Sequence, residues 1–338
     1  MNNVKLISVI IPVYNAENTI ENSVKSVLLS TYRDIEIILV DDGSTDQSPD
    51  ICERLAKKHE NIIVYHNENG GAAKARNFGI EHANGQFISF IDSDDFITNS
   101  YYEILINLLN ETDSDIAVCG HKKVYGNHKD ILEHEIINSN NNTLDMPSSA
   151  ISYSKIEALN GLLYQRNFIS APWGMLSKKE LFSNVRFPAG KRAEDMATIY
   201  KLFAAASKVV RTDAKLYLYF QNKSGTIYTT QSSLNPDYYD NCTEMLQFIE
   251  KNYPESVKAA KSRLFSACFQ ILSETPSDYD NKDFINKLYD TVKNLRFDII
   301  LDNNGKPRNR VAALLSIINI KMLHKLLNNY YIFKLKRL

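Results

Sequence analysis

The first 120 residues alternate short apolar runs with amphipathic segments, and this alternation restricts the fold more than any other feature. The runs are continuous and rich in β-branched residues, as in LISVII and IEIILV. A continuous apolar run is typical of a strand covered by helices on both faces of a parallel sheet. The pattern therefore predicts an α/β fold with a mostly parallel central sheet. The expected strands are 6–11, 35–40, 61–65, 87–91 and 115–119, and the expected helices are 18–30, 46–59, 72–83 and 100–110.

The rest of the chain divides into three parts by composition. Residues 120–150 are polar and rich in Asn, which predicts an irregular surface loop. A second portion that mixes helices and strands is expected from about 150 to 234. From 235 to 338 the apolar residues recur at helical spacing with almost no strand signal, so this part is expected to be a C-terminal helical domain.

Composition and charge exclude several classes of protein. The 39 Lys and Arg residues balance 40 Asp and Glu residues, so no overall positive field favours nucleic acid. The four cysteines stand far apart and form no CxxC pair, which argues against a zinc site or a disulfide scaffold. The amino-terminal segment has no signal-peptide pattern, and no uninterrupted apolar stretch approaches the length of a bilayer span. We therefore expect a cytoplasmic protein.

Polar clusters stand directly after four consecutive predicted strands. Ligands of an open parallel sheet lie outside the carboxyl ends of its strands, so these clusters mark the expected binding edge. They are PVYN (12–15) with Glu17 after the first strand, DDGSTD (41–46) after the second, NENGG (67–71) after the third and DSDD (92–95) after the fourth.

Each cluster also has an ordinary structural explanation. DDGSTD and NENGG consist of common turn residues, and taken alone they favour turns and helix caps. The DSDD run is different, because three carboxylates at one strand end repel one another unless a cation or a hydrogen-bond donor lies among them. A divalent ion held by one or two carboxylates and by substrate phosphates fits that arrangement.

Together the clusters suggest a nucleoside diphosphate ligand. An Asp after the second strand can accept a hydrogen bond from a pyrimidine imide, Tyr14 can stack on the base, and the DSD pair can hold a metal beside the diphosphate. Neither GxGxxG nor GxxxxGK[ST] occurs, so the dinucleotide fingerprint and the phosphate loop do not explain the pattern.

Three segments closely resemble the successive signatures of the family-two, GT-A-type inverting glycosyltransferases. They are SVIIPVYNAENTIENSVKSVLLSTYRDIEIILVDDGSTD, NGGAAKARNFGIEHANGQFISFIDSDD and PWGMLSKKELFSNVRFPAGKRAEDMATIYKLF, in order, within about residues 6–230. The likeness is greatest to bacterial members that build capsule, cell-wall or adhesin glycans. It implies a Rossmann-like GT-A domain over residues 1–234, with a nucleotide-binding half in about 1–120 and an acceptor half in about 150–234.

The resemblance implies roles for individual residues of the donor site. Tyr14 and Asp42 would hold the base. Asp92 and Asp94 match the family's DxD motif, with Asp94 as the direct ligand of Mn²⁺ or Mg²⁺. The expected donor-binding residues are Pro12, Tyr14, Glu17, Asp42, Asn67, Arg76, Asp92 and Ser93.

The resemblance also implies a catalytic pair and an acceptor side. Glu194 and Asp195 match the family's ED motif, in which the Asp is the catalytic base and the Glu supports it. From the sequence alone, Asp195 begins an amphipathic helix, where a carboxylate could serve only the helix dipole. Trp173 and Asp95 are expected beside the acceptor. Many family members have W-x-K-L-Y where this chain has WGMLS, so the acceptor's identity is not implied.

The implied reaction is the metal-dependent transfer of a hexose, with inversion, from a nucleoside diphosphate sugar to a hydroxyl of a glycan, glycolipid or glycoprotein. The leading donors are UDP-Glc, UDP-Gal and the UDP-N-acetylhexosamines. One alternative is a nucleotide-sugar-binding module without turnover, which the intact DSD and ED elements disfavour. A second is a sugar-1-phosphate nucleotidyltransferase, which would carry a Gly-rich basic loop where this chain has PVYNAEN. A hydrolase with paired carboxylates is a third.

The C-terminal segment combines apolar residues at helical spacing with basic residues. Such a stretch can lie on an anionic membrane at the inner face of the cell, near a lipid-linked acceptor. The same apolar stripe can instead pack on the protein or on another copy in a homo-oligomer. The apolar positions are Leu315, Ile318, Met322, Leu326, Tyr330 and Phe333, and the basic ones are Lys321, Lys325, Lys334, Lys336 and Arg337.

Overall fold

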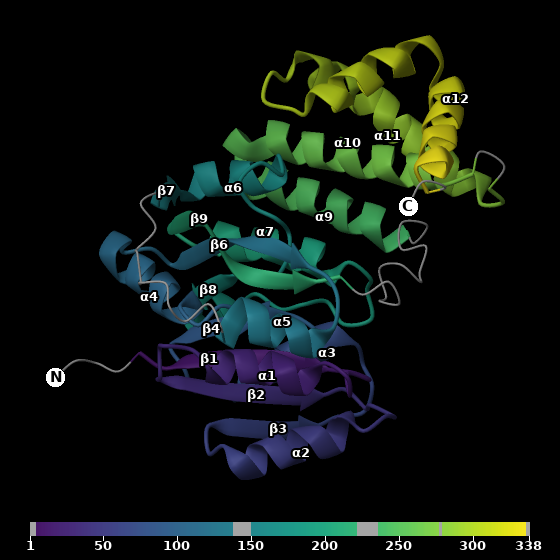
Figure 1. Cartoon of the computed structure of the whole chain (residues 1–338). Coiled ribbons are helices and arrows are strands. Elements are labelled where there is room, and N and C mark those ends of the chain that lie inside the picture. The colour runs from purple at the N-terminus through teal and green to yellow at the C-terminus, as the bar shows by residue number, and fades with distance from the viewer. Residues whose placement is uncertain (1–4, 138–149, 222–235, 277–278, 336–338) are drawn as a thin grey trace. The chain divides into compact units, whose positions relative to one another are not determined.

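The computed structural model describes residues 5–137, 150–221, 236–276 and 279–335, which form two compact units (Figure 1). The first unit contains the residues up to Lys155, then Ala171–Gly190 and the segment that begins at Lys201. The second contains Ile156–Ser170, Lys191–Tyr200 and the C-terminal part of the chain. This division differs from a single boundary after residue 234, because two earlier segments group with the C-terminal helices.

Among the described residues, a nine-stranded sheet forms the first unit, in the order β3-β2-β1-β4-β8-β6-β9-β5 with β7 paired to β9. β1 pairs in parallel with β2 and β4, and β2 pairs in parallel with β3. β8 runs antiparallel between β4 and β6, and β6 pairs in parallel with β9. The strands are β1 (Ile7–Val13), β2 (Ile35–Asp41), β3 (Ile62–His66), β4 (Phe87–Phe90), β5 (Phe96–Ile97), β6 (Ile116–Val124), β7 (Ala150–Ser154), β8 (Met175–Lys178) and β9 (Lys208–Phe220).

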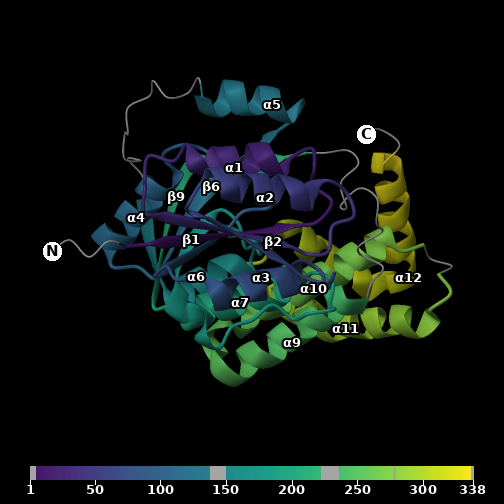
Figure 2. The ribbon, with the colours of Figure 1, turned by 90° about the horizontal axis from the view of Figure 1, so that it is seen from below.

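Helices cover both faces of the parallel half of the sheet. Helices α1 (Ile20–Leu28) and α2 (Ser48–Lys58) lie on one face of β1 and β2, and α3 (Ala72–His82) lies on the other (Figure 2). On the first face, Val9 of β1 belongs to the same core as Val24 of α1 and Leu105 of α4 (Tyr101–Thr112). On the other face, a Cβ added at Gly79 of α3 would come within 2.4 Å of Ile10. Both faces of β1 are therefore buried, as its continuous apolar sequence predicts.

The predicted strands and helices of the first 120 residues are confirmed, with ends that shift by a few residues. The prediction of an irregular loop from 120 to 150 is only partly right. β6 continues to Val124, and α5 (His128–Ile131) and a π-helical turn (Leu132–Ile137) follow it. Residues 138–149, which include most of the Asn-rich run, lie outside the described residues.

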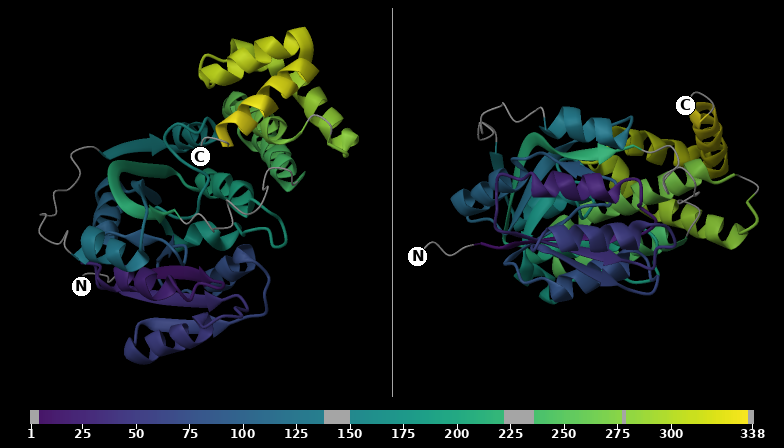
Figure 3. Two further views of the ribbon diagram at one scale, coloured as in Figure 1. Left: turned by 45° about the vertical axis from the view of Figure 1, so that its right-hand side comes forward. Right: turned by 60° about the horizontal axis from the view of Figure 1, so that its bottom comes forward.

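Helices build the second unit, as the helical spacing of its sequence predicts (Figure 3). Its core contains Cys268, Leu288 and Ile299, which are almost fully buried. The segment from α6 (Lys155–Leu163) and the first part of α7 (Glu194–Ala205) group with this unit. The C-terminal helices are α9 (Pro236–Asn252), α10 (Val257–Glu274), α11 (Lys282–Leu301) and α12 (Pro307–Leu335).

Helix α12 departs from two expectations. Its backbone is not helical at Asn319, where φ is −161° and ψ is 108°, so α12 consists of two helical segments joined at this residue. By length and composition alone, Pro307–Phe333 could cross a membrane. The sequence prediction missed this helix as a candidate because Lys and Asn residues interrupt its apolar runs.

A buried carboxylate joins the amino ends of β1, β2 and β4. Glu36 of β2 is 8% exposed and accepts hydrogen bonds from the hydroxyl of Ser8, the backbone and side-chain nitrogens of Asn84, and the backbone of Gly85. Burial alone would raise the pKa of Glu36, but these hydrogen bonds hold it below the ordinary value of 4.5.

We expect Glu36→Gln to lower the free energy of unfolding by about 1–3 kcal/mol at pH 7, because an amide group cannot accept from all of these donors. A depressed carboxyl pKa stabilises the fold above the unfolded-state pKa, and this stabilisation is lost as the pH falls through the folded-state value. The difference between wild type and variant should therefore shrink below pH 4.5. Urea unfolding between pH 3 and pH 7 measures it, with the exposed Glu60→Gln as control. Equal destabilisation at every pH would contradict the prediction that Glu36 is ionised in the folded protein.

Candidate active site

The carboxyl ends of β1, β2, β3 and β4 meet at one edge of the sheet, because these strands are parallel and in register. Val13 pairs with Asp41, and Asp41 pairs with His66 on the next strand. All four predicted polar clusters follow these strand ends. The sheet therefore brings the donor-site candidates of the first unit to a common edge.

Reciprocal hydrogen bonds hold the first two loops of this edge together. The side-chain oxygen of Asn15 accepts from the backbone nitrogen of Thr45 over 2.8 Å. Glu17 accepts from the backbone of Gln47 over 3.1 Å, and its own backbone donates to Asp46 over 3.0 Å. Glu17, predicted to bind the donor, thus connects the β1–α1 and β2–α2 loops in this structure.

The β1–α1 loop also presents an exposed aromatic ring. Asn15 has a positive φ of 47°, a conformation that Asn tolerates better than most residues. Tyr14, directly before it, is 52% exposed, whereas Pro12 is half-buried near the end of β1. The ring of Tyr14 is therefore available to stack on a planar ligand.

Asp42 is the most constrained of the donor-site candidates. Its side chain is buried, with Oδ1 accepting from the backbone of Gly70 over 3.0 Å and Oδ2 from Gly71 over 2.7 Å. Each carboxylate oxygen has two acceptor positions, so one remains on each oxygen. Asp42 thus fixes the β3–α3 loop and keeps capacity for a further donor.

A buried amide without a partner lies beside Asp42. The side-chain nitrogen of Asn67 is buried and has no hydrogen-bond partner among the described residues. The backbone of Asn67 is fixed by donation to the carbonyl of Asp41 over 2.8 Å. Gly43, at φ 73°, lies so close that a Cβ there would approach Asn69 within 2.8 Å. An unsatisfied buried donor is rare, and a ligand acceptor would satisfy it.

A buried arginine neutralises the first carboxylate of the DSDD run. Arg76 of α3 donates to Oδ1 of Asp92 over 3.0 Å, and its guanidinium lies 5.5 Å from the centre of the Phe187 ring. Arg76 is 6% exposed, whereas the side chain of Asp92 is 30% exposed. Ser93 follows in a turn and is half-buried. The pair keeps one side of Asp92 open to a ligand.

Asp94 carries the remaining charge of this cluster. Burial, and then the neighbouring charge of Asp92, raise the pKa of Asp94 to about 6. No carboxylate-to-cation pair of Asp94 occurs among the described residues. A bound cation would relieve the repulsion between the two carboxylates.

Asp95 corrects the sequence prediction of an acceptor contact. It is 0% exposed, its Oδ2 accepts from the hydroxyl of Tyr217 over 2.6 Å, and its Oδ1 accepts from the backbone of Phe220 over 2.8 Å. Burial and the charges of Asp92 and Asp94 raise its pKa. The carboxylate faces β9 and is not accessible to an acceptor.

The side chains at this edge fit a divalent cation for which the protein supplies only part of the coordination shell. No group of three metal-ligating side chains occurs in the parts of the chain that the structure describes. Asp92 and Asp94 supply carboxylate oxygens, which suit hard cations such as Mg²⁺ and Mn²⁺. Such ions commonly bind through one or two carboxylates, with water and substrate phosphates completing the shell.

His128 is a residue of this site that the sequence analysis missed. Its Nε2 lies 2.9 Å from the carbonyl oxygen of Asp94, and its ring packs against the tilted ring of Phe96 with 4.0 Å between centres. Burial lowers the pKa of His128 to about 4, so the imidazole is neutral at pH 7. A neutral ring donates through Nε2 and thereby fixes the main chain at Asp94. His128 comes from the segment predicted as a loop, where no sequence pattern marked it.

Trp173 belongs to an aromatic stack in the first unit. Its ring stacks on Tyr217 at 4.6 Å and on Tyr219 at 5.1 Å between centres, and His121 meets its edge. The two tyrosines are two residues apart on β9, so their side chains lie on the same face of that strand. Because Tyr217 also bonds Asp95, the stack is connected to the end of β4.

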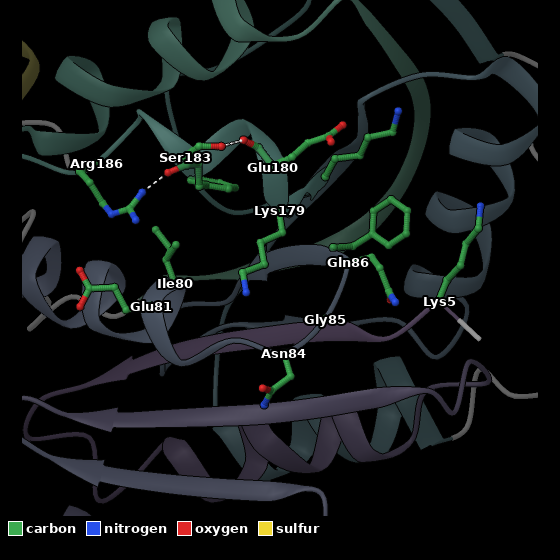
Figure 4. A pocket seen from close by; sticks show the side chains of 13 residues that line it. Lys5, Ile80, Glu81, Asn84, Gly85, Gln86, Lys179, Glu180, Ser183 and Arg186 are labelled. Atoms are coloured by element: carbon green, nitrogen blue, oxygen red, sulfur yellow. Dashed lines mark hydrogen bonds between the residues drawn. The ribbon is translucent and has the colours of Figure 1, made fainter. Parts of the chain in front are cut away.

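A pocket of about 830 Å³ lies at the opposite edge of the sheet, beside the amino ends of β1 and β4 (Figure 4). Lys5 and Gln86 precede these strands, and Lys178 ends β8. Its cations are bound within the protein: Lys178 pairs with Asp115 over 2.7 Å, and Lys179 donates to the carbonyl of Ala83. Despite its size, this pocket contains none of the candidate catalytic residues.

In the second unit, α9 holds the segment that leads into α7. The side chain of Asn241 donates to the carbonyls of Arg192 and Ala193 over 3.0 and 3.1 Å. The backbone of Arg192 donates to Asp237 over 2.9 Å. Ala193 has a positive φ of 53°, which is unusual for a residue with a Cβ. Strain of this kind is concentrated at functional sites.

Asp195 lines a pocket of about 300 Å³ within the second unit. Its Oδ1 accepts from the backbone of Met196 over 2.7 Å. Arg263, which is 5% exposed, lies at the pocket and donates to the sulfur of Met196, a weak acceptor. The lining residues are Ser170, Arg192, Ala193, Asp195, Met196, Tyr238, Arg263 and Gln270. Glu194, next to Asp195, does not line this pocket, and its carbonyl accepts from Thr198.

The structure therefore brings the candidates together in two groups. In the first unit, the donor-site residues, Asp94 and Trp173 converge on the carboxyl edge of the sheet. In the second unit, Asp195 faces a polar pocket with two arginines. Besides His128, the sequence analysis missed Tyr217, Tyr219, Arg192, Tyr238 and Arg263. Among these residues, only Tyr217 and Tyr219 show a local sequence pattern, because their two-residue spacing places both on one face of a strand.

Comparison with known proteins gives consistent matches over most of the chain. The family model described as glycosyl transferase family 2 matches residues 8–185. The glycosyltransferase GlyG of Streptococcus pneumoniae serotype 4 is 35% identical over 232 residues, which cover 68% of this chain and 75% of GlyG.

Two solved structures share the fold at low sequence identity. TarS residues 1–349 of S. aureus, in complex with UDP-GlcNAc, superpose with a TM-score of 0.69 at 20% identity, covering 96% of this chain and 91% of that one. The mannosyltransferase PcManGT of Pyrobaculum calidifontis, in complex with GDP-Man and Mn²⁺, gives a TM-score of 0.53 at 16% identity, covering 96% and 87%. The predicted GT-A fold is thereby confirmed.

We expect Tyr217→Phe to destabilise the first unit by about 1–3 kcal/mol, because the buried Asp95 loses its hydroxyl donor while the aromatic stack is kept. Tyr219→Phe is the matched control, since its ring stacks on the same Trp173 but its hydroxyl does not bond Asp95. Urea unfolding of both variants measures the difference. Equal stability of the two variants would contradict the expected contribution of the Asp95 contact.

Proposed function

Since this chain belongs to glycosyl transferase family 2, we propose that it transfers a hexose from a nucleoside diphosphate sugar to an acceptor hydroxyl, with inversion at the anomeric carbon. The observation that carries the proposal is the convergence of Asp42, Asn67 and the Arg76–Asp92 pair beside Asp94 at one sheet edge. A base, a diphosphate and a cation each find complementary groups there.

The nucleotide of the proposed donor is uridine diphosphate. Asp42 keeps acceptor capacity that suits the imide of uracil, and the exposed ring of Tyr14 can stack on the base. TarS, which shares the fold, has been solved with UDP-GlcNAc, and this supports the same nucleotide here. The proposed donors are UDP-Glc, UDP-Gal or a UDP-N-acetylhexosamine.

Asp94 and Asp92 would hold Mn²⁺ or Mg²⁺ in this proposal. When bound, a divalent cation supplies positive charge beside the leaving diphosphate. The raised pKa of Asp94 supports a site in which one carboxylate lacks a protein cation. PcManGT, a structure of the same fold, was solved with Mn²⁺.

Asp195 is the proposed general base. As the acceptor hydroxyl attacks the anomeric carbon, its proton passes to the carboxylate of Asp195 and the bond from that carbon to the diphosphate breaks. A single displacement inverts the configuration and requires no covalent enzyme intermediate. The strained Ala193 and the hydrogen bonds from Asn241 support a precise position for this carboxylate.

The proposed acceptor is a hydroxyl of a glycan, a lipid-linked saccharide or a glycoprotein in the cytoplasm. Trp173 offers a flat apolar face of the kind that stacks on a sugar ring, and its stack on Tyr217 and Tyr219 keeps it in place. Arg192 and Tyr238 add donors to the pocket that Asp195 lines.

The donor proposal predicts nucleotide-dependent stabilisation in a thermal-shift panel of nucleotide sugars, with and without Mn²⁺. A ligand at about 100-fold over its Kd stabilises the native state by about 2.7 kcal/mol. UDP sugars should raise Tm more with Mn²⁺ than without it, and Asp94→Asn should abolish the metal-dependent part. Asp34→Asn, an exposed Asp elsewhere on the same unit, is the control. A metal-dependent shift that survives in Asp94→Asn would refute the metal assignment, and no shift with any nucleotide would refute the donor site.

Asp195→Asn should leave UDP affinity near normal and reduce transfer by about 10²–10⁴, the usual contribution of a general base. Glu194→Gln, the neighbouring carboxylate outside the pocket, should cost much less. Calorimetry measures UDP binding, and release of UDP in the presence of acceptor measures transfer. Transfer within a few-fold of wild type in Asp195→Asn would require another base, and the fully buried Asp95 does not qualify.

A further inference from the structure

Helix α12 carries most of the large apolar side chains that the described residues expose. Eighteen such side chains are exposed, and ten of them lie on this one helix. Isolated exposed apolar residues are normal on a protein surface, but a contiguous group marks an interaction site. The ten are Val311, Leu314, Leu315, Ile317, Ile318, Met322, Leu326, Tyr330, Ile332 and Phe333.

The exposed side chains form a stripe along each segment of α12. Before the break at Asn319, Val311, Leu314, Leu315 and Ile318 recur at i, i+3, i+4 and i+7. After it, Met322, Leu326, Tyr330 and Phe333 recur at i, i+4, i+8 and i+11. This spacing places each set on one side of its helical segment. We call these eight residues the apolar stripe.

The side of α12 away from the stripe is packed within the second unit. Ala313, Ile320 and Leu323 belong to its core. Nε2 of His324 lies 2.7 Å from the carbonyl oxygen of Thr275, and the side chain of Asn328 donates to the carbonyl of Ser273 over 3.2 Å. One side is therefore firmly docked on α10, and the stripe is the side left open. All eight side chains of the stripe are exposed, so packing within the described part of the chain does not bury the stripe.

The charge of the same segment has one sign. From Asn303 to Leu338 the sequence contains eight Lys and Arg residues and no Asp or Glu, whereas the preceding 302 residues contain 31 basic and 40 acidic residues. Lys321 and Lys325 are exposed and stand directly before Met322 and Leu326 of the stripe. Lys336 and Arg337 lie outside the described residues. The near-neutral total charge thus conceals a strongly basic C-terminal segment.

We propose that the apolar stripe and its basic border bind the surface of an anionic lipid bilayer. An amphipathic helix of this kind lies in the interface, with its apolar side chains among the acyl chains and its basic groups at the headgroups. Anionic headgroups complement the single sign of charge, and each Lys or Arg near such a surface strengthens binding. The lipid surface is thus the partner that satisfies both features together.

Two other partners fit less well. In a symmetric dimer the stripe would face its own copy, which would bring Lys321 and Lys325 of two chains into one interface without a carboxylate on α12. A helix that crosses the bilayer would surround with lipid the hydrogen-bonded side of His324 and Asn328, and the break at Asn319 would leave backbone groups unpaired in hydrocarbon. Surface binding has neither cost.

Vesicle co-sedimentation of the full chain tests the apolar part of the proposal. The probes are vesicles of phosphatidylcholine alone and vesicles with about one-third phosphatidylglycerol. The chain should bind the anionic vesicles, and Tyr330→Glu should weaken partitioning by about tenfold or more. Tyr125→Glu is the matched control, because Tyr125 and Tyr330 are both 68% exposed and the substitutions change charge equally. Equal Tm values for the two variants establish that folding is unaffected.

The basic part is tested by a second matched pair. Lys321→Gln with Lys325→Gln should weaken binding to anionic vesicles by about tenfold or more at low salt, and rising salt should weaken the wild type. Lys57→Gln with Lys58→Gln, two exposed lysines of α2, should change nothing.

Three results would overturn the proposal. One is equal binding to neutral and anionic vesicles. A second is a dimer in solution that Tyr330→Glu converts to monomer while vesicle binding is unchanged. The third is that wild-type protein stays bound to the vesicles after washing with high salt and carbonate, which would indicate a spanning helix. None of these measurements needs a sugar donor or acceptor, so the proposed transfer reaction and the membrane contact can fail independently.

Discussion

The repulsion among three neighbouring carboxylates at the end of β4 determines how the side chains around this strand end are arranged. Each of the three carboxylates has a different environment. Asp92 has a cationic partner in Arg76, and Asp95 turns inward to the hydroxyl of Tyr217 and the backbone of Phe220. Asp94 has neither, and its burial, followed by the neighbouring charge of Asp92, raises its pKa. We infer that this incomplete neutralisation leaves Asp94 available to the proposed cation site.

The solution for Asp95 also connects the two halves of the sheet. Tyr217 lies on β9, which pairs with β5 and β6 beyond the antiparallel strand β8. The hydroxyl of Tyr217 thus donates a hydrogen bond to Asp95 after β4, and its ring stacks on Trp173. The aromatic face and the acidic strand end are therefore parts of one packed assembly. Substitutions at the two places are therefore expected to have non-additive effects on stability, because contacting groups do not act independently.

The elements that local sequence determines could be predicted, and those that depend on distant partners could not. LISVII and IEIILV specify buried strands by themselves, and the strand-end rule then places Asp42, Asn67 and Asp94 at one edge. The four-residue strand β8 has too little pattern to be recognised, and α5 lies within a polar segment. The inward turn of Asp95 depends on a tyrosine 122 residues later in the sequence. No local pattern distinguishes it from Asp94, which stands next to it.

The distribution of charge is a second property that whole-chain composition conceals. In the sequence analysis the net charge of −1 served as an argument against nucleic acid, but this total averages an acidic body with a basic C-terminal segment. Screening limits each charge to about 8–10 Å at physiological ionic strength, so a partner responds to the nearest helix and not to the total. On α12 the nearest charges are all basic and adjoin exposed apolar side chains. The proposed cation site at Asp94 and the proposed lipid-binding stripe share this property, because in each place the fold leaves one sign of charge locally unbalanced.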